Sequence, residues 1–311
     1  MSPLVTIGIP CYNTARWIKA AVDSALAQTW PQKQVIVVDD GSTDGSRDIL
    51  RGYGDAIDVV FANHRGSNPA RNEILRLAKG EWVQYLDADD FLLPEKIERQ
   101  FAETAGGADC DVIYSPVWID QNNERRASAL DTSLDIYSQW IAWELPQTGG
   151  CLWRKATLEK LNGWNEEMPC CQEHELYLRA LKAGMRFRLA PTPNAVYRIW
   201  SDDTLCRRDT YLVTQVKTRL IDDMRAWMEL HDLWTPVSSR VAGQACFELS
   251  RSMVNRSLEE ADAYHQARRE VGLISASGPA APAPYRFVYK IAGFKSAERL
   301  ARAMRGLRKQ R

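Results

Sequence analysis

The chain has 311 residues, and its 40 Lys and Arg balance its 40 Asp and Glu, so its net charge at pH 7 is zero. This length can bury one large core or two smaller ones, and a neutral chain has no overall attraction to nucleic acid. The apolar runs fall far short of the roughly 20 residues that span a bilayer, and the stretch 4–9 is too short for a signal peptide.

The seven cysteines are odd in number and lack the spacing of a disulfide framework. Cys170, Cys171 and His174 form a cluster that is short of the ligands of a structural zinc site. We therefore expect free or buried thiols in a reducing cytoplasm.

Short apolar runs alternate with amphipathic segments over the first 110 residues. The predicted strands are 4–9 (ended by Pro10), 35–38, 57–61 and 82–86. The predicted helices run from a Thr14 cap to Leu26, from Ser42 or Thr43 onward, from Asn68 to about residue 79, and after Pro94. This alternation predicts an α/β fold with a mostly parallel sheet, and the continuous apolar strands fit burial between helices.

The pattern is less regular beyond residue 110. Further strands are predicted at 112–114, after Gly149-Gly150 and at 195–199, with a helix over 173–183. Amphipathic helices follow from about 210 to 272. The segment 275–284 is rich in Ser, Ala, Gly and Pro and is predicted to be a linker.

Carboxylates cluster directly after two of the apolar strands. Asp39 and Asp40 precede Gly41-Ser42, and Asp87, Asp89 and Asp90 follow the strand 82–86. Ligands of open α/β sheets bind at the carboxyl ends of strands. One of the first two carboxylates can cap the turn and leave the other free for a nucleobase N–H. The second cluster favours a divalent metal with a phosphorylated ligand over a solvated acidic turn.

Two further segments accompany these carboxylates. In Pro10-Cys11-Tyr12-Asn13, the Tyr12 ring can stack on a planar base or pack in a turn. In the segment Gly66 to Asn72, Arg71 can meet a phosphate, hold an acidic loop in place, or lie on the surface.

Together and in this order, these motifs resemble family 2 glycosyltransferases of the GT-A fold. The resemblance implies a Rossmann-like sheet, a nucleotide-sugar donor such as a UDP-sugar, a Mg²⁺ or Mn²⁺ ion, and inversion at the anomeric carbon. It places the donor against seven residues, with Tyr12 stacking on uracil, Asp40 at the base edge and Arg71 positioning the nucleotide. Those residues are Pro10, Tyr12, Asn13, Asp40, Arg71, Asp87 and Asp89. The resemblance assigns the metal to Asp89 and Asp90.

Two positions depart from the family pattern. The family often has Glu-Asp before x-x-Leu, where the Asp is the catalytic base, and alignment on Leu176 puts Glu173 at that place. Glu can also accept a hydroxyl proton. His174 and Glu175 are competing candidates for the base, and the structural alternative is that Glu173 is a first-turn acid favoured by the helix dipole. Trp200 stands where many relatives have a His that approaches the metal. Because Trp cannot ligate a metal, either the carboxylates and the diphosphate alone hold the ion, or Arg198 or a later residue takes over. Trp200 could instead stack on the sugar.

The last segment, 285–311, is strongly basic and has Glu298 as its single acid. Its apolar residues fall at helical spacing, so it either lies on an anionic bilayer or docks on the protein body. Nucleic-acid binding is disfavoured because few aromatic residues are interleaved with the arginines.

The sequence therefore predicts an inverting glycosyltransferase that moves a sugar to a hydroxyl of a glycan or lipid-linked acceptor. It is expected to be cytoplasmic, with peripheral contact to the inner face of the plasma membrane through 285–311. We expect residues 1–110 to bind the nucleotide-sugar and 111–208 the acceptor, followed by a helical extension over 209–274, a linker over 275–284 and a tail over 285–311. The alternatives are a non-catalytic nucleotide-sugar-binding module and a sugar nucleotidyltransferase. The latter would need a Gly-rich, basic loop that Pro10–Asn13 does not provide.

Overall fold

The computed structural model describes residues 2–122, 124–200 and 209–309, with side chains described up to residue 304. The chain forms two compact units. The first comprises Met1–Asp131 and Glu144–Asp202, and the second comprises Thr132–Trp143 and Asp203–Arg311. Residues 132–143, which we expected in the acceptor-binding half, thus belong to the second unit, where α5 (Ile136–Ile141) contacts α10 (Pro236–Met253).

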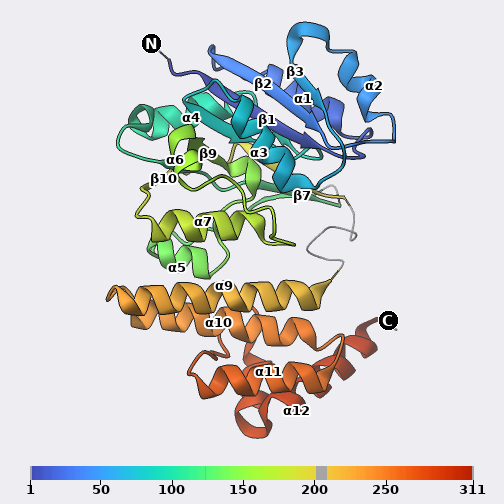
Figure 1. The fold of residues 1–311 in the computed structure, drawn as a ribbon. Helices are drawn as coiled ribbons and strands as arrows, with labels where there is room; N and C mark the ends of the chain where they lie inside the picture. Colours follow the sequence, from blue (N-terminus) through green and yellow to red (C-terminus); the bar gives the residue numbers. More distant parts are fainter. Residues whose placement is uncertain (1, 123, 201–208, 310–311) are drawn as a thin grey trace. The chain divides into compact units, whose positions relative to one another are not determined.

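A seven-stranded sheet forms the centre of the first unit (Figure 1). Its strands lie in the order β10-β6-β9-β4-β1-β2-β3, and β9 runs antiparallel to β4 and β6 while the other pairs are parallel. The expected mostly parallel sheet is therefore confirmed. The strands are β1 (Val5–Cys11), β2 (Lys33–Asp39), β3 (Asp58–Phe61), β4 (Trp82–Tyr85), β6 (Val112–Tyr114), β9 (Cys151–Arg154) and β10 (Phe187–Leu189).

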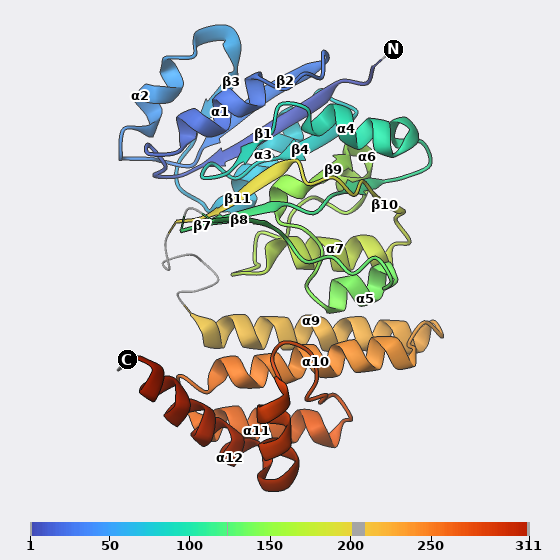
Figure 2. The same ribbon diagram turned by 180° about the vertical axis from the view of Figure 1, so that it is seen from behind.

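Helices of the first unit connect these strands. They are α1 (Ile18–Leu26), α2 (Ser46–Arg51), α3 (Ser67–Leu77), α4 (Lys96–Glu103), α6 (Lys155–Lys160) and α7 (Gln172–Lys182). A smaller mixed sheet has the order β5-β11-β7-β8, and β11, β7 and β8 run side by side in Figure 2. They are β5 (Phe91–Leu92), β7 (Trp118–Gln121), β8 (Glu124–Ala127) and β11 (Ala195–Ile199). This sheet brings the end of β11 next to the acidic loop that follows β4.

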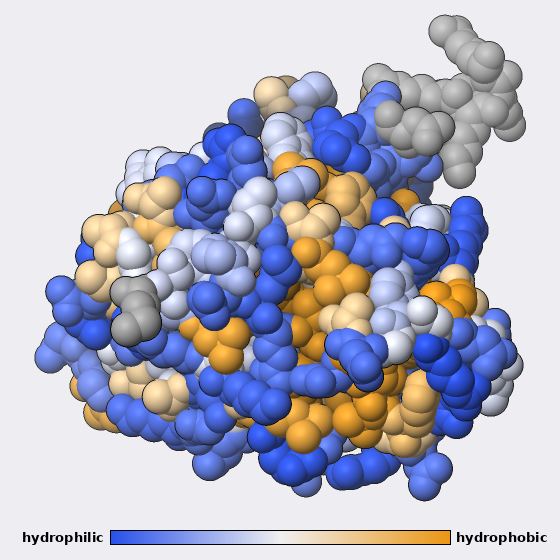
Figure 3. Space-filling model, turned by 90° about the horizontal axis from the view of Figure 1, so that it is seen from above, coloured by the Kyte–Doolittle hydropathy of each residue, from blue (hydrophilic) through white to orange (hydrophobic). Residues whose placement is uncertain are grey.

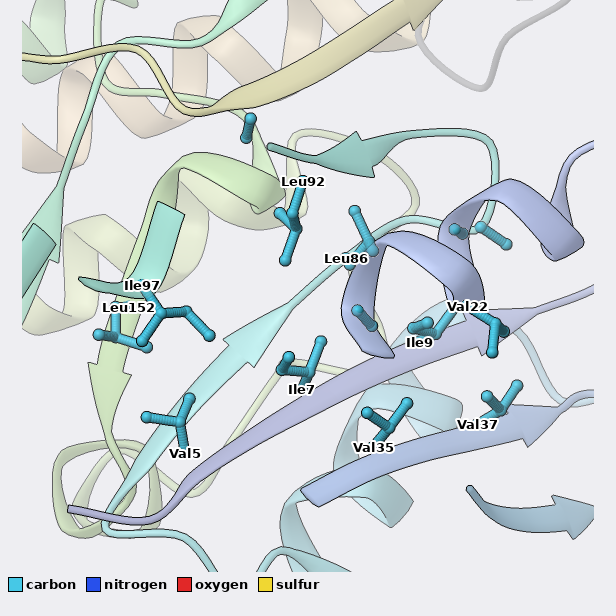
Figure 4. Packing of buried hydrophobic residues seen from close by; sticks show 14 of the residues in the cluster. Val5, Ile7, Ile9, Val22, Val35, Val37, Leu86, Leu92, Ile97 and Leu152 are labelled. Atoms are coloured by element: carbon cyan, nitrogen blue, oxygen red, sulfur yellow. The ribbon is translucent and has the colours of Figure 1, made fainter. Parts of the chain in front are cut away.

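The main core lies on one face of the large sheet. Val5, Ile7 and Ile9 of β1 alternate along the strand and point to the same side (Figure 4). Val35 and Val37 of β2 join them in one fully or nearly buried cluster, which α1 and α4 cover. Burying each such side chain contributes roughly 1.5–3 kcal/mol. The surface of the molecule seen in Figure 3 is mostly hydrophilic, with apolar residues gathered in a band over its middle.

The parallel register sets the position of the polar segments. Cys11 at the end of β1 pairs with Asp39 at the end of β2, and Gly8 pairs with Tyr85 at the end of β4. The loops that follow β1, β2 and β4 therefore leave the sheet at the same edge. This edge collects the predicted site residues from the first 90 positions.

Three local predictions were wrong. The first strand continues through Pro10. Proline has no backbone N–H to donate, but β4 pairs with β1 only as far as Gly8, so no ladder hydrogen bond to β4 is lost at Pro10. Thr14 does not cap α1 with its side chain. Its carbonyl accepts from Trp17 and Ile18 in a turn, and the helix begins at Ile18.

The helix predicted to start at Ser42 or Thr43 begins at Ser46. Ser42 instead accepts a hydrogen bond from the Asn13 N–H, and its own N–H donates to Asp39. These contacts hold the loop after β2 against the loop after β1, so the chain cannot become helical until it has passed Gly45.

The second unit is helical. Its long helices are α9 (Thr210–Leu230), α10, α11 (Leu258–Glu270) and α12 (Ala283–Lys309), and Gly293 interrupts α12. The segment predicted to be a linker packs on α10. The Ser275 N–H donates to the Gly243 carbonyl, Gln244 bonds Ser277, and Ala281 is fully buried.

Candidate active site

The loops after β1 and β2 place Tyr12 beside Asp40. Asp40 is buried, and its two carboxylate oxygens accept the backbone N–H groups of Arg65 and Gly66, both at 2.8 Å. A third contact, also 2.8 Å, joins Asp40 Oδ2 to His64 Nδ1. The His64 ring stacks on Tyr12, with centroids 4.0 Å apart. Asp40 is thus not the free acceptor that the sequence predicted, because the segment 64–66 already surrounds it.

A second side of Asp40 faces a cavity of about 300 Å³. Strand residues Val38 and Val60, the loop residues Asn63 and Arg65, and the outer face of α3 line it. In the loop, Asn63 and Arg65 face this cavity while His64, between them, faces Tyr12.

Asn13 ties the first two loops together. Its Oδ1 accepts the Thr43 N–H at 2.8 Å, and its own N–H donates to Ser42. The backbone of Asn13 is left-handed (φ 51°), a conformation that Asn tolerates better than most residues. Pro10 is half-buried within β1. These two residues shape the loop that carries Tyr12.

Arg71 lies buried at the centre of the site. Its guanidinium donates to Asp87 Oδ1 at 2.7 Å and to Gln172 Oε1 at 3.0 Å, and it lies over the Trp164 ring. Burial lowers the pKa of Arg71, but the charges of Asp87 and Glu173 outweigh that effect and the pKa is raised. Of the roles that the sequence left open, this geometry is that of an arginine that holds the acidic loop.

The amides of α3 fasten the segment that leads to α7. Asn68 donates to the Asn165 carbonyl at 2.7 Å. Asn72 donates to the Trp164 carbonyl, and its Oδ1 accepts the Trp164 N–H at 2.8 Å. Gly163 has φ 67°, and a Cβ there would lie 2.4 Å from Asn72 Oδ1. No role for these amides was predicted, although Asn72 belongs to the motif Gly66 to Asn72.

Glu173 lies in the first turn of α7 and faces Thr148. Thr148 Oγ1 donates to Glu173 Oε1 at 2.5 Å, while Oε2 makes no hydrogen bond to the described residues. A narrow recess lined by Tyr85, Trp153 and Trp164 adjoins the Glu173 carboxylate. Thr148, which was not predicted as a site residue, fixes Oε1 of this carboxylate and leaves Oε2 available to accept a proton.

The competing carboxylate, Glu175, is engaged elsewhere. Arg179 binds both of its oxygens at 2.8 Å and also donates to the Gly163 carbonyl. A carboxylate held in this bidentate way is a structural partner rather than a proton acceptor. His174 is buried against Tyr177.

The acidic loop meets the end of β11. Asp90 is buried and accepts the Arg198 N–H at 2.8 Å, while Asp89 accepts the Trp200 indole N–H at 2.8 Å. Burial, followed by the charges of Asp89 and Asp87, raises the pKa of Asp90 well above its ordinary value. Burial and the charge of Asp87 also raise the pKa of Asp89, although the hydrogen bond from Trp200 lowers it in part.

This loop fits a divalent cation that takes part of its shell from phosphate. Within the described residues, no group of three or more His, Cys, Asp and Glu is placed to hold a metal ion by itself. Mg²⁺ typically uses one or two carboxylates and completes its shell with water and phosphate oxygens. Burial, together with repulsion among the carboxylates of this loop, raises the pKa values of Asp89 and Asp90, and a bound cation would offset both effects.

Trp200 and Arg198 supply the contacts around this loop. Besides binding Asp89, Trp200 stays about half exposed, at 48%, and lies against Trp17. Arg198 donates to the Asp89 carbonyl and covers the Phe91 ring. Trp200 therefore orients the Asp89 carboxylate, which a His at the same position could also do.

The described cysteines are all buried and form no disulfide: Cys11, Cys110, Cys151, Cys170, Cys171 and Cys246. Cys170 and Cys171 lie with their sulfurs 3.9 Å apart, and Cys171 adopts a left-handed backbone (φ 56°) that starts α7.

The structure brings the predicted residues together in two connected groups. Tyr12 and Asp40 form one, with His64. Asp87, Arg71 and Glu173 form the other, with Thr148 and Gln172, and Asp89 and Asp90 extend it along the acidic loop.

Residues 6–175 match a family model described as glycosyl transferase family 2. An uncharacterized glycosyltransferase of Rickettsia typhi is 44% identical over 99 residues, which are 32% of this chain and 31% of that protein. The putative teichuronic acid biosynthesis glycosyltransferase TuaG of Bacillus subtilis is 42% identical over 102 residues, 32% of this chain and 40% of that protein. The chondroitin synthase of Escherichia coli is 30% identical over 198 residues, 58% of this chain and 27% of that protein. The chain spans less than half the length of each of these relatives.

Solved structures of the same fold cover most of the chain. S. aureus TarS 1–349 in complex with UDP-GlcNAc aligns with a TM-score of 0.61 at 16% identity, covering 84% of this chain and 88% of that one. The mannosyltransferase PcManGT of Pyrobaculum calidifontis, in complex with GDP-Man and Mn²⁺, aligns with a TM-score of 0.58 at 19% identity, covering 96% and 83%. At these identities the likeness shows the fold alone.

Proposed function

Because the chain belongs to glycosyl transferase family 2 and has the GT-A fold of its structural neighbours, we propose that it is an inverting glycosyltransferase. It would move a sugar from a nucleoside diphosphate, UDP in our proposal, to a hydroxyl of a glycan or lipid-linked acceptor. The observation that carries this proposal is the bridge made by Arg71. Its guanidinium joins Asp87 of the acidic loop to Gln172, the residue next to Glu173.

In the proposed reaction, Glu173 Oε2 accepts the proton of the acceptor hydroxyl. The hydroxyl oxygen then bonds to the anomeric carbon from the face opposite the nucleotide, and the bond from that carbon to the diphosphate breaks. Thr148 orients Glu173 for this task. General-base catalysis of this kind contributes about 10²- to 10⁴-fold in rate.

The nucleotide would occupy the edge formed by Tyr12, Asp40 and the acidic loop. Asp89 and Asp90 would hold a Mg²⁺ or Mn²⁺ ion, which stabilises negative charge on the leaving diphosphate when it is bound. Trp200 and Arg198 keep these two carboxylates in place. The diphosphates of the donors in the TarS and PcManGT complexes support this choice of ligand.

The test combines a donor panel with two variants. Sugar nucleotides of UDP, GDP, ADP, CDP and dTDP are incubated with Mn²⁺, and both binding and release of the nucleoside diphosphate are measured. We expect Asp90→Ala to lose metal-dependent binding and turnover, and Glu173→Gln to lose turnover while binding persists. Full turnover in Glu173→Gln would remove this residue as the base. Binding without any turnover, across a panel of glycan and lipid-linked acceptors, would identify a non-catalytic binding module.

We further propose that α12 contacts an anionic lipid surface. Among the described residues, no helix has the length and hydropathy needed to cross a membrane. On α12, however, Phe287 and Ile291 are 67% and 71% exposed, and Leu300 and Met304 are also exposed. Large exposed apolar side chains of this kind are typical of interaction surfaces.

The charges on α12 favour an anionic bilayer as the partner. Lys290, Arg299 and Arg302 are exposed. The single acid, Glu298, is 1% exposed and pairs with Arg251. An outward surface with basic and apolar groups and no exposed carboxylate complements anionic headgroups.

Vesicle sedimentation tests this contact. We expect the protein to sediment with vesicles that contain phosphatidylglycerol and not with vesicles of phosphatidylcholine alone. Ile291→Ser should weaken the binding several-fold, while Leu230→Ser, at an 80% exposed position of α9, should not. Equal effects of the two substitutions would exclude α12 as the specific contact.

A further inference from the structure

His64 makes the two contacts that the proposed function requires of a nucleobase. Its imidazole stacks on Tyr12, with ring centroids 4.0 Å apart and an angle of 19° between the planes. Its Nδ1 lies 2.8 Å from Asp40 Oδ2. A planar nitrogen heterocycle thus covers the tyrosine face and approaches the carboxylate at the same time.

The imidazole of His64 occupies the side of the Asp40 carboxylate that lies toward Tyr12. The backbone N–H groups of Arg65 and Gly66 already bind its two oxygens, and His64 Nδ1 lies 2.8 Å from Oδ2 and 3.2 Å from the Asp40 backbone carbonyl oxygen. A base that stacks on this face of Tyr12 and donates to Asp40 Oδ2 would overlap the imidazole. The base and the imidazole therefore exclude each other.

We propose that His64 is an internal stand-in for the nucleobase. Its imidazole occupies the base position in the donor-free protein and leaves that position when the donor binds. This inference rests on the proposed function, because it assumes a nucleotide at Tyr12 and Asp40. It assigns His64 a role in setting donor affinity, since the nucleotide binds only the fraction of molecules in which the imidazole has turned away.

The local structure allows the side chain to move without the backbone. The His64 side chain is 55% exposed and belongs to a segment, 62–66, that is neither helix nor strand. The backbone of this segment is held in place. Gly41, with φ +84°, packs so closely against it that a Cβ there would lie 2.8 Å from the His64 backbone nitrogen. Rotation about the His64 side-chain bonds is therefore the motion that clears the site.

Calorimetric titration of nucleotides tests the proposal. UDP, GDP, ADP, CDP and dTDP are each titrated with Mn²⁺ into the full chain and into His64→Ala. Removing the internal competitor should tighten binding of the preferred nucleotide about 3- to 10-fold. His231→Ala is the matched control, because His231 is an exposed histidine stacked on Trp227 at 4.4 Å, and it should leave affinity unchanged.

A second readout follows the imidazole directly in the wild-type chain. The chain has four histidines, so their ring C–H signals can be assigned by NMR with the aid of His64→Ala. Stacking on Tyr12 shields the His64 signal, and we expect nucleotide to move it downfield to an unstacked value.

The outcomes separate the two proposals. Binding to the wild type with equal or weaker affinity in His64→Ala overturns the role of His64 and leaves the proposed function standing. A His64 signal that keeps its shielded position in the nucleotide complex overturns it as well. If none of the five nucleotides binds either protein, the proposed function itself fails.

Discussion

Lys96 is a buried lysine whose charge should make stability depend on pH. It lies at the start of α4, is fully buried, and donates through Nζ to the neutral side chain of Gln84. Gln84 in turn donates to the Gly149 carbonyl, next to Thr148. The lysine thus supports the turn that orients Glu173. Burial lowers the pKa of Lys96 from 10.5 to about 7, which the nearby Cys151 offsets only in part.

The sign of the pH effect follows from this lowered pKa. Between pH 7 and 10.5 the unfolded chain binds a proton at Lys96 that the folded protein largely lacks. The free energy of unfolding therefore rises with pH through this window, and this gain in stability is lost as the pH falls from 10.5 toward 7. At 1.36 kcal/mol per pK unit, the full effect is about 5 kcal/mol, and the part between pH 7 and pH 9 is about 2 kcal/mol.

Lys96→Met isolates this contribution. Urea unfolding of both proteins, followed by tryptophan fluorescence, is measured at pH 7, 8 and 9. The wild type should gain about 2 kcal/mol relative to the variant between pH 7 and pH 9. Loss of the contact to Gln84 adds an offset that does not change with pH. Lys160→Met, at an exposed position of α6, should run parallel to the wild type. A constant difference between Lys96→Met and the wild type across this range would refute the reasoning.

Two further substitutions test the supports of the site. Gly163→Ala should cost about 2–4 kcal/mol in urea unfolding, because it combines a left-handed backbone with a Cβ 2.4 Å from Asn72 Oδ1. Gly184→Ala, with φ +72° and no atom within 4 Å of the new Cβ, should cost only about 1 kcal/mol, and similar losses in the two would exclude the clash. Trp200→Phe should weaken Mn²⁺-dependent nucleotide binding about 10-fold in calorimetry, because Asp89 loses a charge-assisted hydrogen bond. Unchanged affinity would show that Trp200 does not orient the metal site.

Local patterns predicted the elements that depend on burial. Continuous apolar runs placed β1, β2 and β4, and amphipathic spacing placed α3 and α7. The predicted starts of α1 and α2 were wrong. Hydrogen bonds between the loops after β1 and β2, such as that from the Asn13 N–H to Ser42, decide where each helix begins. Such contacts join residues about 30 positions apart and leave no local signal.

The predicted site residues likewise have a local signal in the sequence, and the missed ones depend on contacts between distant residues. Tyr12, Asp40 and Asp87 stand at strand ends, where a polar residue after an apolar run is visible in the chain itself. Thr148 and Gln172 act on Glu173 and Arg71 across the fold, and neither has a distinctive neighbourhood in the sequence.

The sequence by itself determined which chemical groups reach the carboxyl edge of the sheet, because strand burial and parallel register follow from residue type and order. Only the tertiary structure decided how those groups are used. Arg71 binds the acidic loop, Asp40 is surrounded by the segment 64–66, and His64 covers Tyr12. The physical reason is that a hydrogen bond depends on distances of about 3 Å between atoms. Packing of segments from different parts of the chain sets those distances, and residue order alone does not.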